Sequence, residues 1–336
     1  MTGRRILAVL PDHPWPTDMG SRVRNLRILE ALAGRFELTI VSLLHDRAAL
    51  DDPGPAARLG RFHPVLASHR RGAVRWAGWH LRARAAGLVR GLHPETYFQS
   101  LPVLAATVRR VLESERPDLV HAAYWYGLRR LRRFPRPPLW VVDTHDVQFE
   151  RHERLLGRVS AGEKRQELAE LGRYDRIVAI TGRDARTLEA SLPAPAPPID
   201  VIGMGLDLQR WRPEAVERAR PAGERIAFYG NLATEANQEG ARHLLEAILP
   251  AVRRAIPGAE GLLIGAGLTE PLRALAGRAG AEATGFVPDP RPWLRSAAVL
   301  ALTLRTGSGQ RGRVVEAVSL GVPVVGYPEA LEGLDL

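Results

Sequence analysis

Short apolar runs alternate with amphipathic segments of helix length at the start of the chain. Residues 6–10 form a flat apolar run flanked by charged residues, which is typical of a buried strand. A loop rich in proline and aspartate follows and ends at Gly20. Apolar residues then recur at helical spacing as far as Gly34, and a second apolar run covers 36–43. A strand, a helix and a strand in this order predict a βαβ unit, and therefore a parallel sheet.

The alternation continues in two separate series. In the first, further buried strands are expected at 119–122, 139–143 and 176–180. A connector with four prolines in seven residues (193–199) and the hinge-like segment VIGMGLDLQRWRPE come next. The second series begins at Arg225 and contains a strongly periodic helix after Asn237. We therefore expect an α/β protein with parallel-sheet domains over 1–205 and 206–336. The strands of the second domain are expected at 225–230, 261–264, 282–286, 299–302 and 322–325.

Length and composition agree with two globular domains. A chain of 336 residues suits two domains of about 150 residues each, and 45% apolar residues can fill two cores. The absence of cysteine excludes disulfides, thiolate metal sites and a cysteine nucleophile. The apolar run near the start is too short for an export signal, and no apolar stretch reaches 18 residues. We expect a cytoplasmic protein.

The net charge of +10, nearly all from arginine, leaves two interpretations open. The arginines can serve an anionic partner, namely nucleic acid, acidic lipid or a phosphorylated small molecule, or they can reflect an arginine-rich genome. No known nucleic-acid-binding module is recognisable, so we expect no nucleic-acid partner.

Two expected helix starts are rich in glycine, and helix N-termini offer unpaired N–H groups to anions. The first is DMGSRVRN, with Gly20, and the second is RTGSGQRGRVVEA. The second adds arginines, whose guanidinium groups bind phosphate through two parallel hydrogen bonds. A diphosphate cradle is one interpretation, and a tight turn with solvated arginines is the other. Glu316 lies one turn into an apolar helix, where ribose hydroxyls or an arginine would be its partner.

The segment GSGQRGRVVEAVSLGVPVV makes the first interpretation specific, because it resembles the donor-binding motif of glycosyltransferase family four. Arg313 stands where the family has lysine. ILAVLPDHPWPTDMGSRVRN resembles the family's opening strand and glycine loop, and VIGMGLDLQRWRP its hinge. FYGNLATEANQEGARHLLEAILP is similar to the start of its donor domain. The matching motif positions are Gly307, Gly309, Arg311, Glu316, Ala317, Gly321, Pro323, Val324 and Val325.

The resemblance implies a GT-B fold, in which two Rossmann-like domains face a cleft. It implies a retaining, metal-independent transferase, and a hexosyl group is the group that we expect it to transfer. The sugar would move from a nucleotide-diphosphate sugar to a glycan, lipid-linked or small-molecule acceptor, and no cofactor is expected. VVDTHDVQFERHERL resembles the segment whose histidine lies near the donor sugar and acceptor, which makes His145 the expected catalytic residue. The expected donor-binding residues are Gly20, Ser308, Gly309, Arg311, Arg313 and Glu316.

Departures from the family pattern keep other functions open. Ser308 stands where many members have the first glutamate of a pair, which favours a non-catalytic, nucleotide-binding subunit as the alternative. The chain ends at Leu336, before the family's last strand and helices, so the second domain looks truncated. A dinucleotide fingerprint begins at Gly265 but is incomplete, which argues against an oxidoreductase or epimerase. The sequence contains no D-x-D motif and no histidine cluster, so no metal site is predicted.

The segment 74–92 has one narrow apolar face, with Trp76, Trp79 and several arginines on the other side. Tryptophan with arginine on an exposed face is typical of a helix that lies on a membrane surface. Tryptophans that pack beneath a loop are the alternative. The first interpretation would add a peripheral contact with the anionic inner face of the membrane.

Overall fold

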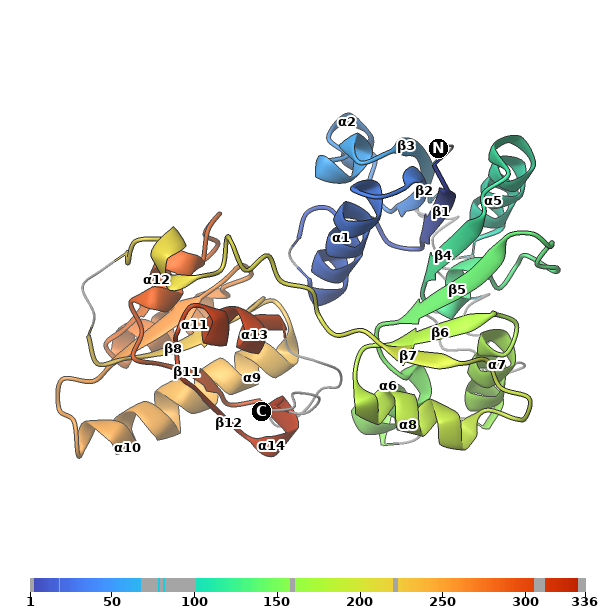
Figure 1. Ribbon diagram of the computed structural model, residues 1–336. Coiled ribbons are helices and arrows are strands. Elements are labelled where there is room, and N and C mark those ends of the chain that lie inside the picture. The colour runs from blue at the N-terminus through green and yellow to red at the C-terminus, as the bar shows by residue number, and fades with distance from the viewer. Residues whose placement is uncertain are drawn as a thin grey trace. The chain divides into compact units, whose positions relative to one another are not determined.

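The computed structural model describes residues 3–17, 19–67, 78, 81, 101–157, 161–219, 223–304 and 312–331. The chain forms two compact units, Met1–Gly203 and Met204–Leu336, and each contains one sheet (Figure 1). The chain passes from one unit to the other within the segment VIGMGLDLQRWRPE. In the part of the chain that the structure describes, no helix is long and apolar enough to cross a membrane.

The first unit is built on seven parallel strands in the order β3-β2-β1-β4-β5-β6-β7. α-Helices lie between most successive strands, and a 3₁₀ turn lies between β4 and β5; such crossover connections are what parallel pairing requires. The strands are β1 (Arg5–Leu10), β2 (Glu37–Leu44), β3 (Arg61–Leu66), β4 (Leu119–Ala123), β5 (Leu139–Thr144), β6 (Arg176–Ala179) and β7 (Ile199–Val201). The helices are α1 (Gly20–Ala33), α2 (Ala48–Asp51), α5 (Pro102–Glu115), α6 (Gln148–Leu156), α7 (Ala161–Leu171) and α8 (Gly182–Ser191), with 3₁₀ turns η1 (Pro55–Arg58) and η3 (Trp125–Leu128).

Strand β1 shows why this sheet is buried on both faces. Leu7 and Val9 point into one hydrophobic cluster, whereas Ile6, Ala8 and Leu10 point into another. Successive side chains of a strand alternate between faces, so an uninterrupted apolar run needs a core on each side. Each fully buried leucine or isoleucine contributes about 1.5–3 kcal/mol, so the central strands supply much of the free energy that stabilises the unit.

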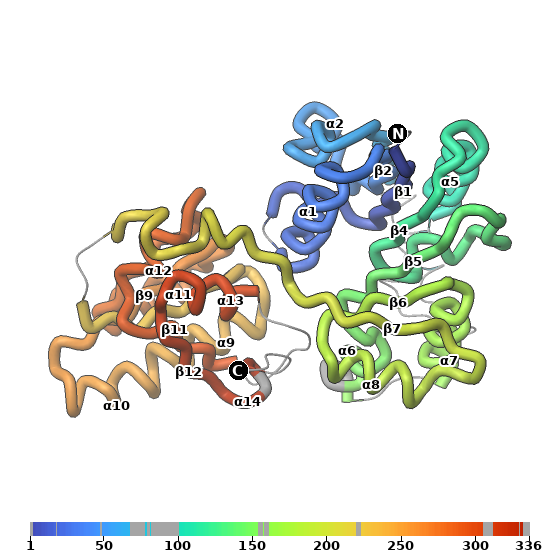
Figure 2. Tube along the Cα trace, viewed as in Figure 1, coloured from blue at the N-terminus to red at the C-terminus, as the bar shows by residue number. Residues whose placement is uncertain are grey.

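The second unit has five parallel strands in the order β10-β9-β8-β11-β12. Its Cα trace runs from yellow to red in Figure 2. Its strands are β8 (Arg225–Tyr229), β9 (Glu260–Ile264), β10 (Ala281–Ala283), β11 (Val299–Leu302) and β12 (Val324–Gly326). Its helices are α9 (Glu235–His243), α10 (Leu249–Arg253), α11 (Glu270–Arg278), α12 (Arg291–Arg295), α13 (Gly312–Ser319) and α14 (Pro328–Leu331), with a 3₁₀ turn η4 (Pro213–Ala215).

The predicted helix after Asn237 is present, but its hydrogen bonding changes part-way. A π turn, η5 (Leu244–Ile248), separates α9 from α10. Pro250 follows it and has no N–H to donate to the carbonyl four residues earlier. A single π turn inside a helix accommodates such a missing bond, and the apolar face stays buried.

Candidate active site

Gly20 is the first residue of α1 and follows the loop after β1. A Cβ at Gly20 would meet nothing within 4 Å, so the backbone there is open to a ligand. The N-cap residue Met19 makes no side-chain capping bond, and the first turn holds no acidic residue. Within the described residues, this helix start therefore has uncapped N–H groups, from which an anion can accept hydrogen bonds.

Arg24, one turn further along α1, forms a fully buried ion pair with Asp143 near the end of β5. The Arg24 side chain is 1% exposed and that of Asp143 is 0% exposed. Nε and Nη2 of Arg24 each donate to the carboxylate at 2.9 Å, and Nη1 donates to the Gly203 carbonyl at 2.7 Å. Burial alone would raise the pKa of Asp143, but interactions with His145 and Arg24 outweigh it and lower that pKa.

His145 lies two residues beyond Asp143 and is buried. Among the described residues, neither of its ring nitrogens has a hydrogen-bond partner. Burial lowers the pKa of His145 to about 4; Arg24 acts in the same direction, and Asp143 opposes it. The imidazole is therefore neutral at pH 7. A buried ring nitrogen without a partner costs free energy, and such a group is suited to bonding a substrate.

Tyr124 adds an aromatic ring to this edge of the sheet. Its ring centroid lies 4.2 Å from that of His145, and its N–H donates to the Asp143 carbonyl at 2.9 Å. Its φ of 61° is uncommon for a residue with a side chain. Sequence reasoning missed Tyr124, Arg24 and Asp143. The one available signal was the aspartate in the apolar strand LWVVDT, because a buried carboxylate needs a partner.

In the second unit, Arg313 on α13 lies against the end of β8. Its Nη1 donates to the Tyr229 carbonyl at 2.7 Å and to Asn237 Oδ1 at 3.1 Å. Asn237 in turn donates from Nδ2 to the Asn231 carbonyl at 2.6 Å, which fixes the orientation of its amide. A Cβ at Gly230 would lie 2.5 Å from Arg313 Nη1, so only glycine leaves room for the guanidinium there.

Glu316 follows Arg313 by three residues on α13, so both side chains lie on the same side of the helix. Its carboxylate is near the Tyr229 hydroxyl. Burial raises the pKa of Tyr229 well above its usual value, and the charge of Glu316 raises it further. A carboxylate can accept about four hydrogen bonds in all, and a ribose diol can donate two of them.

The remaining predicted residues fall outside the described part of the chain. Ser308, Gly309 and Arg311 belong to 305–311, and Trp76 and Trp79 also lie beyond the described residues. The structure thus places Arg313 and Glu316 on one helix of the second unit. In the first unit, Gly20 begins the helix that follows β1, and His145 directly follows the end of β5. Within the described ranges, no group of three potential metal ligands occurs.

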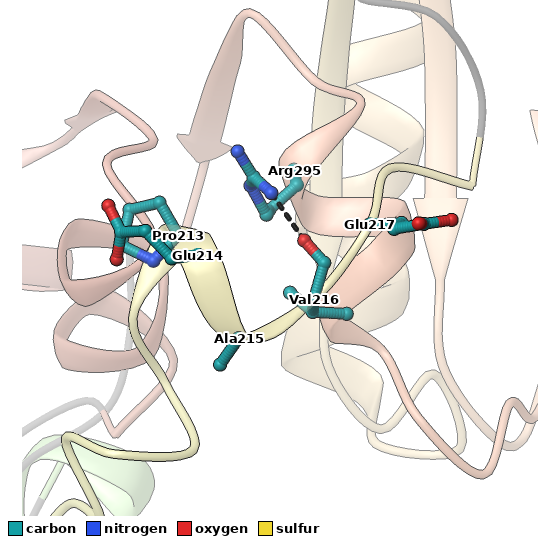
Figure 3. Close-up of a pocket in the computed structure, with 6 residues that line it drawn as sticks. All are labelled: Pro213, Glu214, Ala215, Val216, Glu217 and Arg295. Carbon is teal, nitrogen blue, oxygen red and sulfur yellow. Dashed lines mark hydrogen bonds between the residues drawn. The ribbon is translucent and has the colours of Figure 1, made fainter.

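A hollow of about 310 Å³ in the second unit contains none of the predicted residues. It is formed where the segment Pro213–Glu217 runs past α12, and Arg295 donates to the Val216 carbonyl beside it (Figure 3). Because this bond ties the segment to α12, the hollow reflects packing of the connecting chain.

Comparison with known families decides the class of protein. Residues 19–210 match the family described as Glycosyltransferase Family 4, and residues 223–333 match one described as Glycosyl transferases group 1. The chain belongs to Glycosyltransferase Family 4. The predicted enzyme class, a glycosyltransferase, is therefore confirmed.

Individual relatives are more distant. A GDP-mannose-dependent alpha-(1-6)-phosphatidylinositol monomannoside mannosyltransferase of Mycobacterium tuberculosis is 27% identical over 275 residues, which span 74% of this chain and 69% of that protein. A solved structure of sucrose-phosphate synthase from Thermosynechococcus elongatus is 17% identical, with a TM-score of 0.71 over 99% of this chain and 82% of that one. Anabaena HepE in complex with UDP is 16% identical, with a TM-score of 0.65 over 98% and 81%. With the two parallel sheets, these likenesses confirm the predicted GT-B fold.

Proposed function

We propose that this glycosyltransferase moves a hexosyl group from a nucleotide-diphosphate sugar to an acceptor hydroxyl, with retention of anomeric configuration and without a metal ion. The observation that carries the proposal is the placement of Arg313 and Glu316 on one helix, with the Arg313 guanidinium held at the end of β8. A fixed cation and a carboxylate at that spacing suit a diphosphate and a ribose on one nucleotide.

The relatives support a nucleotide sugar but leave the base open. The mycobacterial relative is named as GDP-mannose-dependent, whereas Anabaena HepE is a complex with UDP. In the proposed reaction, the bond between the anomeric carbon and the diphosphate oxygen breaks. The acceptor oxygen bonds to that carbon on the same face, and its proton passes to the departing diphosphate.

Charge develops on the departing diphosphate, so its stabilisation dominates the proposed catalysis. The start of α1 at Gly20, with Ser308, Gly309, Arg311 and Arg313, would contact the phosphates. Glu316 would accept hydrogen bonds from the ribose. His145, which is neutral at pH 7, would bond the sugar or the acceptor hydroxyl. Arginine charge would take the place of a metal ion at the phosphates.

Calorimetry with UDP, GDP and pyrophosphate, followed by a transfer assay with a panel of nucleotide sugars, tests the proposal. Arg311→Ala should weaken binding of both nucleotides by about 1.5–3 kcal/mol, the range for hydrogen bonds to charged groups. Glu316→Gln should weaken nucleotides much more than pyrophosphate, because pyrophosphate has no ribose. His145→Ala should keep nucleotide binding and lower transfer. If Arg311→Ala binds every nucleotide as tightly as wild type, the donor site is elsewhere.

The second candidate is a non-catalytic subunit that binds nucleotides. Ser308, in place of the usual glutamate, is the observation that favours it. Tight nucleotide binding with no turnover of any donor in the panel, either alone or with candidate acceptors, would support this alternative.

A further inference from the structure

An aspartate near a histidine often orients the imidazole and increases its basicity, as in catalytic triads. His145 and Asp143 look at first like such a pair, because they lie two residues apart at one strand end. Asp143 Oδ2 is nevertheless 3.7 Å from His145 Nε2, which is beyond hydrogen-bond distance. The reason for this separation lies on another element, helix α1.

Arg24 binds the Asp143 carboxylate, to which His145 would otherwise donate a hydrogen bond. Its Nε donates to both oxygens of Asp143, at 3.2 and 2.9 Å, and its Nη2 donates to Oδ1 at 2.9 Å. The planar guanidinium fixes the plane of the carboxylate, which a flexible ammonium group would not do. The third nitrogen, Nη1, is held by the Gly203 carbonyl, so the guanidinium itself has little freedom.

We infer that Arg24 is a positioning residue for His145: it retains the Asp143 carboxylate in a two-pronged ion pair and so leaves both imidazole nitrogens of His145 for the substrate. This inference rests on the proposed function for its consequence in catalysis. Arg24 touches no reacting atom in this scheme; it acts through Asp143 and through its own positive charge near His145.

The groups that face His145 determine how its protonation responds when Arg24 is changed. Asp143 comes from β5, Arg24 from α1, His121 from β4 and Asp12 from the loop after β1, and the Tyr124 ring packs alongside. Replacing Arg24 by methionine removes a nearby cation and frees Asp143 to bond the imidazole. Both changes stabilise the imidazolium, so the pKa of His145 should rise from its present value of about 4.

The experiment measures kcat/KM for sugar transfer from pH 3 to 8 in wild type, Arg24→Met, Arg24→Lys and the double variant Arg24→Met/Asp143→Asn, so that an acid limb near pH 4 falls inside the window. The acid limb of the profile should move upward by at least one pH unit in Arg24→Met. Arg24→Lys should move it by less, because an ammonium restores the charge without the fork. In the double variant no carboxylate is released, so the limb should return toward that of wild type.

A purely structural role for Arg24 would give a different pattern. Activity would then fall by the same factor at every pH, with the acid limb unmoved, and the inference would be overturned. If Arg24→Met does not fold, Arg24→Lys still decides the matter, since an unshifted limb in that variant contradicts the inference.

NMR titration of the His145 ring, assigned with His145→Gln, separates this inference from the proposed function. If wild type transfers no sugar, the proposed function fails, yet the ring can still be titrated. A His145 pKa that is the same in wild type and Arg24→Lys would then reject the positioning role. A higher pKa in Arg24→Lys would support it.

Discussion

Arg313 shows how a single charged side chain is held in place by neutral groups. The Tyr229 carbonyl and Asn237 accept its hydrogen bonds, and Gly230 leaves room for the guanidinium. These three groups are uncharged, so their contacts orient the guanidinium without adding a negative charge to it. An additional carboxylate in place of one of these neutral groups would compete with a phosphate for the guanidinium.

Asn237→Asp should therefore weaken binding while keeping the fold. The new carboxylate has nearly the same shape and would lie about as far from Arg313 Nη1 as the amide oxygen does, which is 3.1 Å. We expect affinity for UDP and pyrophosphate to fall about tenfold, which is roughly 1.4 kcal/mol. Thermal stability should also fall, because the hydrogen bond from Asn237 Nδ2 to the Asn231 carbonyl is lost. Isothermal titration calorimetry checks the loss of affinity.

Gln238→Glu is the matched control, because it adds the same charge one residue further along α9. An equal loss of affinity in both variants would mean that general electrostatics, and not the contact with Arg313, is responsible. Unchanged affinity in Asn237→Asp would contradict the prediction.

The sequence motifs predicted individual site residues but not the residues that contact them. Gly20, His145, Arg313 and Glu316 belong to recognisable segments, and the structure places them at strand ends and helix starts. The partnership of Arg24 with Asp143 joins residues that are 119 positions apart. No local pattern carries such information, since both residue types are common on protein surfaces.

Helix α6 depends on a carboxylate from the neighbouring helix α7. Its N-cap residue, Val147, cannot cap, and the Gln148 and Phe149 N–H groups instead donate to Glu167 at 2.9 and 2.8 Å. Glu167 is 0% exposed, and burial raises its pKa to about 8 although these two bonds oppose the rise. The N-terminal N–H groups of the helix that follows His145 thus donate to a buried titratable group.

Glu167→Gln should make stability less dependent on pH. Because the folded-state pKa of about 8 exceeds the usual 4.5, the folded protein retains this proton after the unfolded chain has released it. The stabilisation is complete below pH 4.5 and is lost as pH rises through 8. From pH 6.5 to 8.5, wild type should lose about 2 kcal/mol of unfolding free energy that the variant does not lose. Urea unfolding at several pH values measures this, and parallel curves for the two proteins would contradict it.

The membrane contact of the segment 74–92 stays a prediction. If Trp76 and Trp79 enter the bilayer interface, changing both to alanine should reduce sedimentation with anionic liposomes several-fold. Zwitterionic liposomes provide the control for charge. If the wild-type protein does not sediment with anionic liposomes at low salt, the alternative is favoured, in which the tryptophans pack beneath a loop.

The strands that the sequence predicted and those it missed differ in their position within the sheet. Strands β1, β2, β4 and β5 are central or nearly so, and their apolar runs are continuous. Strands β3 and β7 are the two edges of the first sheet, and both were missed. Strand β3 contains Pro64 and is only partly buried, and β7 is a three-residue strand just after the proline-rich connector. Edge strands need less apolar surface, so their pattern is weak.

The ends of other predicted elements shifted for local reasons. Strand β10 covers Ala281–Ala283 and not 282–286, because Gly285 adopts a φ of 68° that ends the extended backbone. Strand β12 starts at Val324, directly after Pro323, which has no N–H for the ladder. Hydrophobic pattern locates a strand, but backbone chemistry decides where it stops.

For the whole molecule, the absence of a metal requirement is the main untested prediction. If arginines neutralise the diphosphate, donor binding and transfer should survive EDTA with less than a twofold change. The same assays after addition of manganese provide the comparison. Loss of activity in EDTA and recovery with manganese would show that the cation at the phosphates is a metal ion.

The bond from Arg24 to the Gly203 carbonyl has a consequence for cutting the chain into its two units. Gly203 is the last residue of the first unit, yet its carbonyl satisfies a deeply buried guanidinium. A fragment that ends at Val201 would leave that N–H without its acceptor, at a cost of about 1–3 kcal/mol. Domain exchange between relatives should therefore place the junction after Gly203, so that the first unit keeps the peptide group that completes its interior.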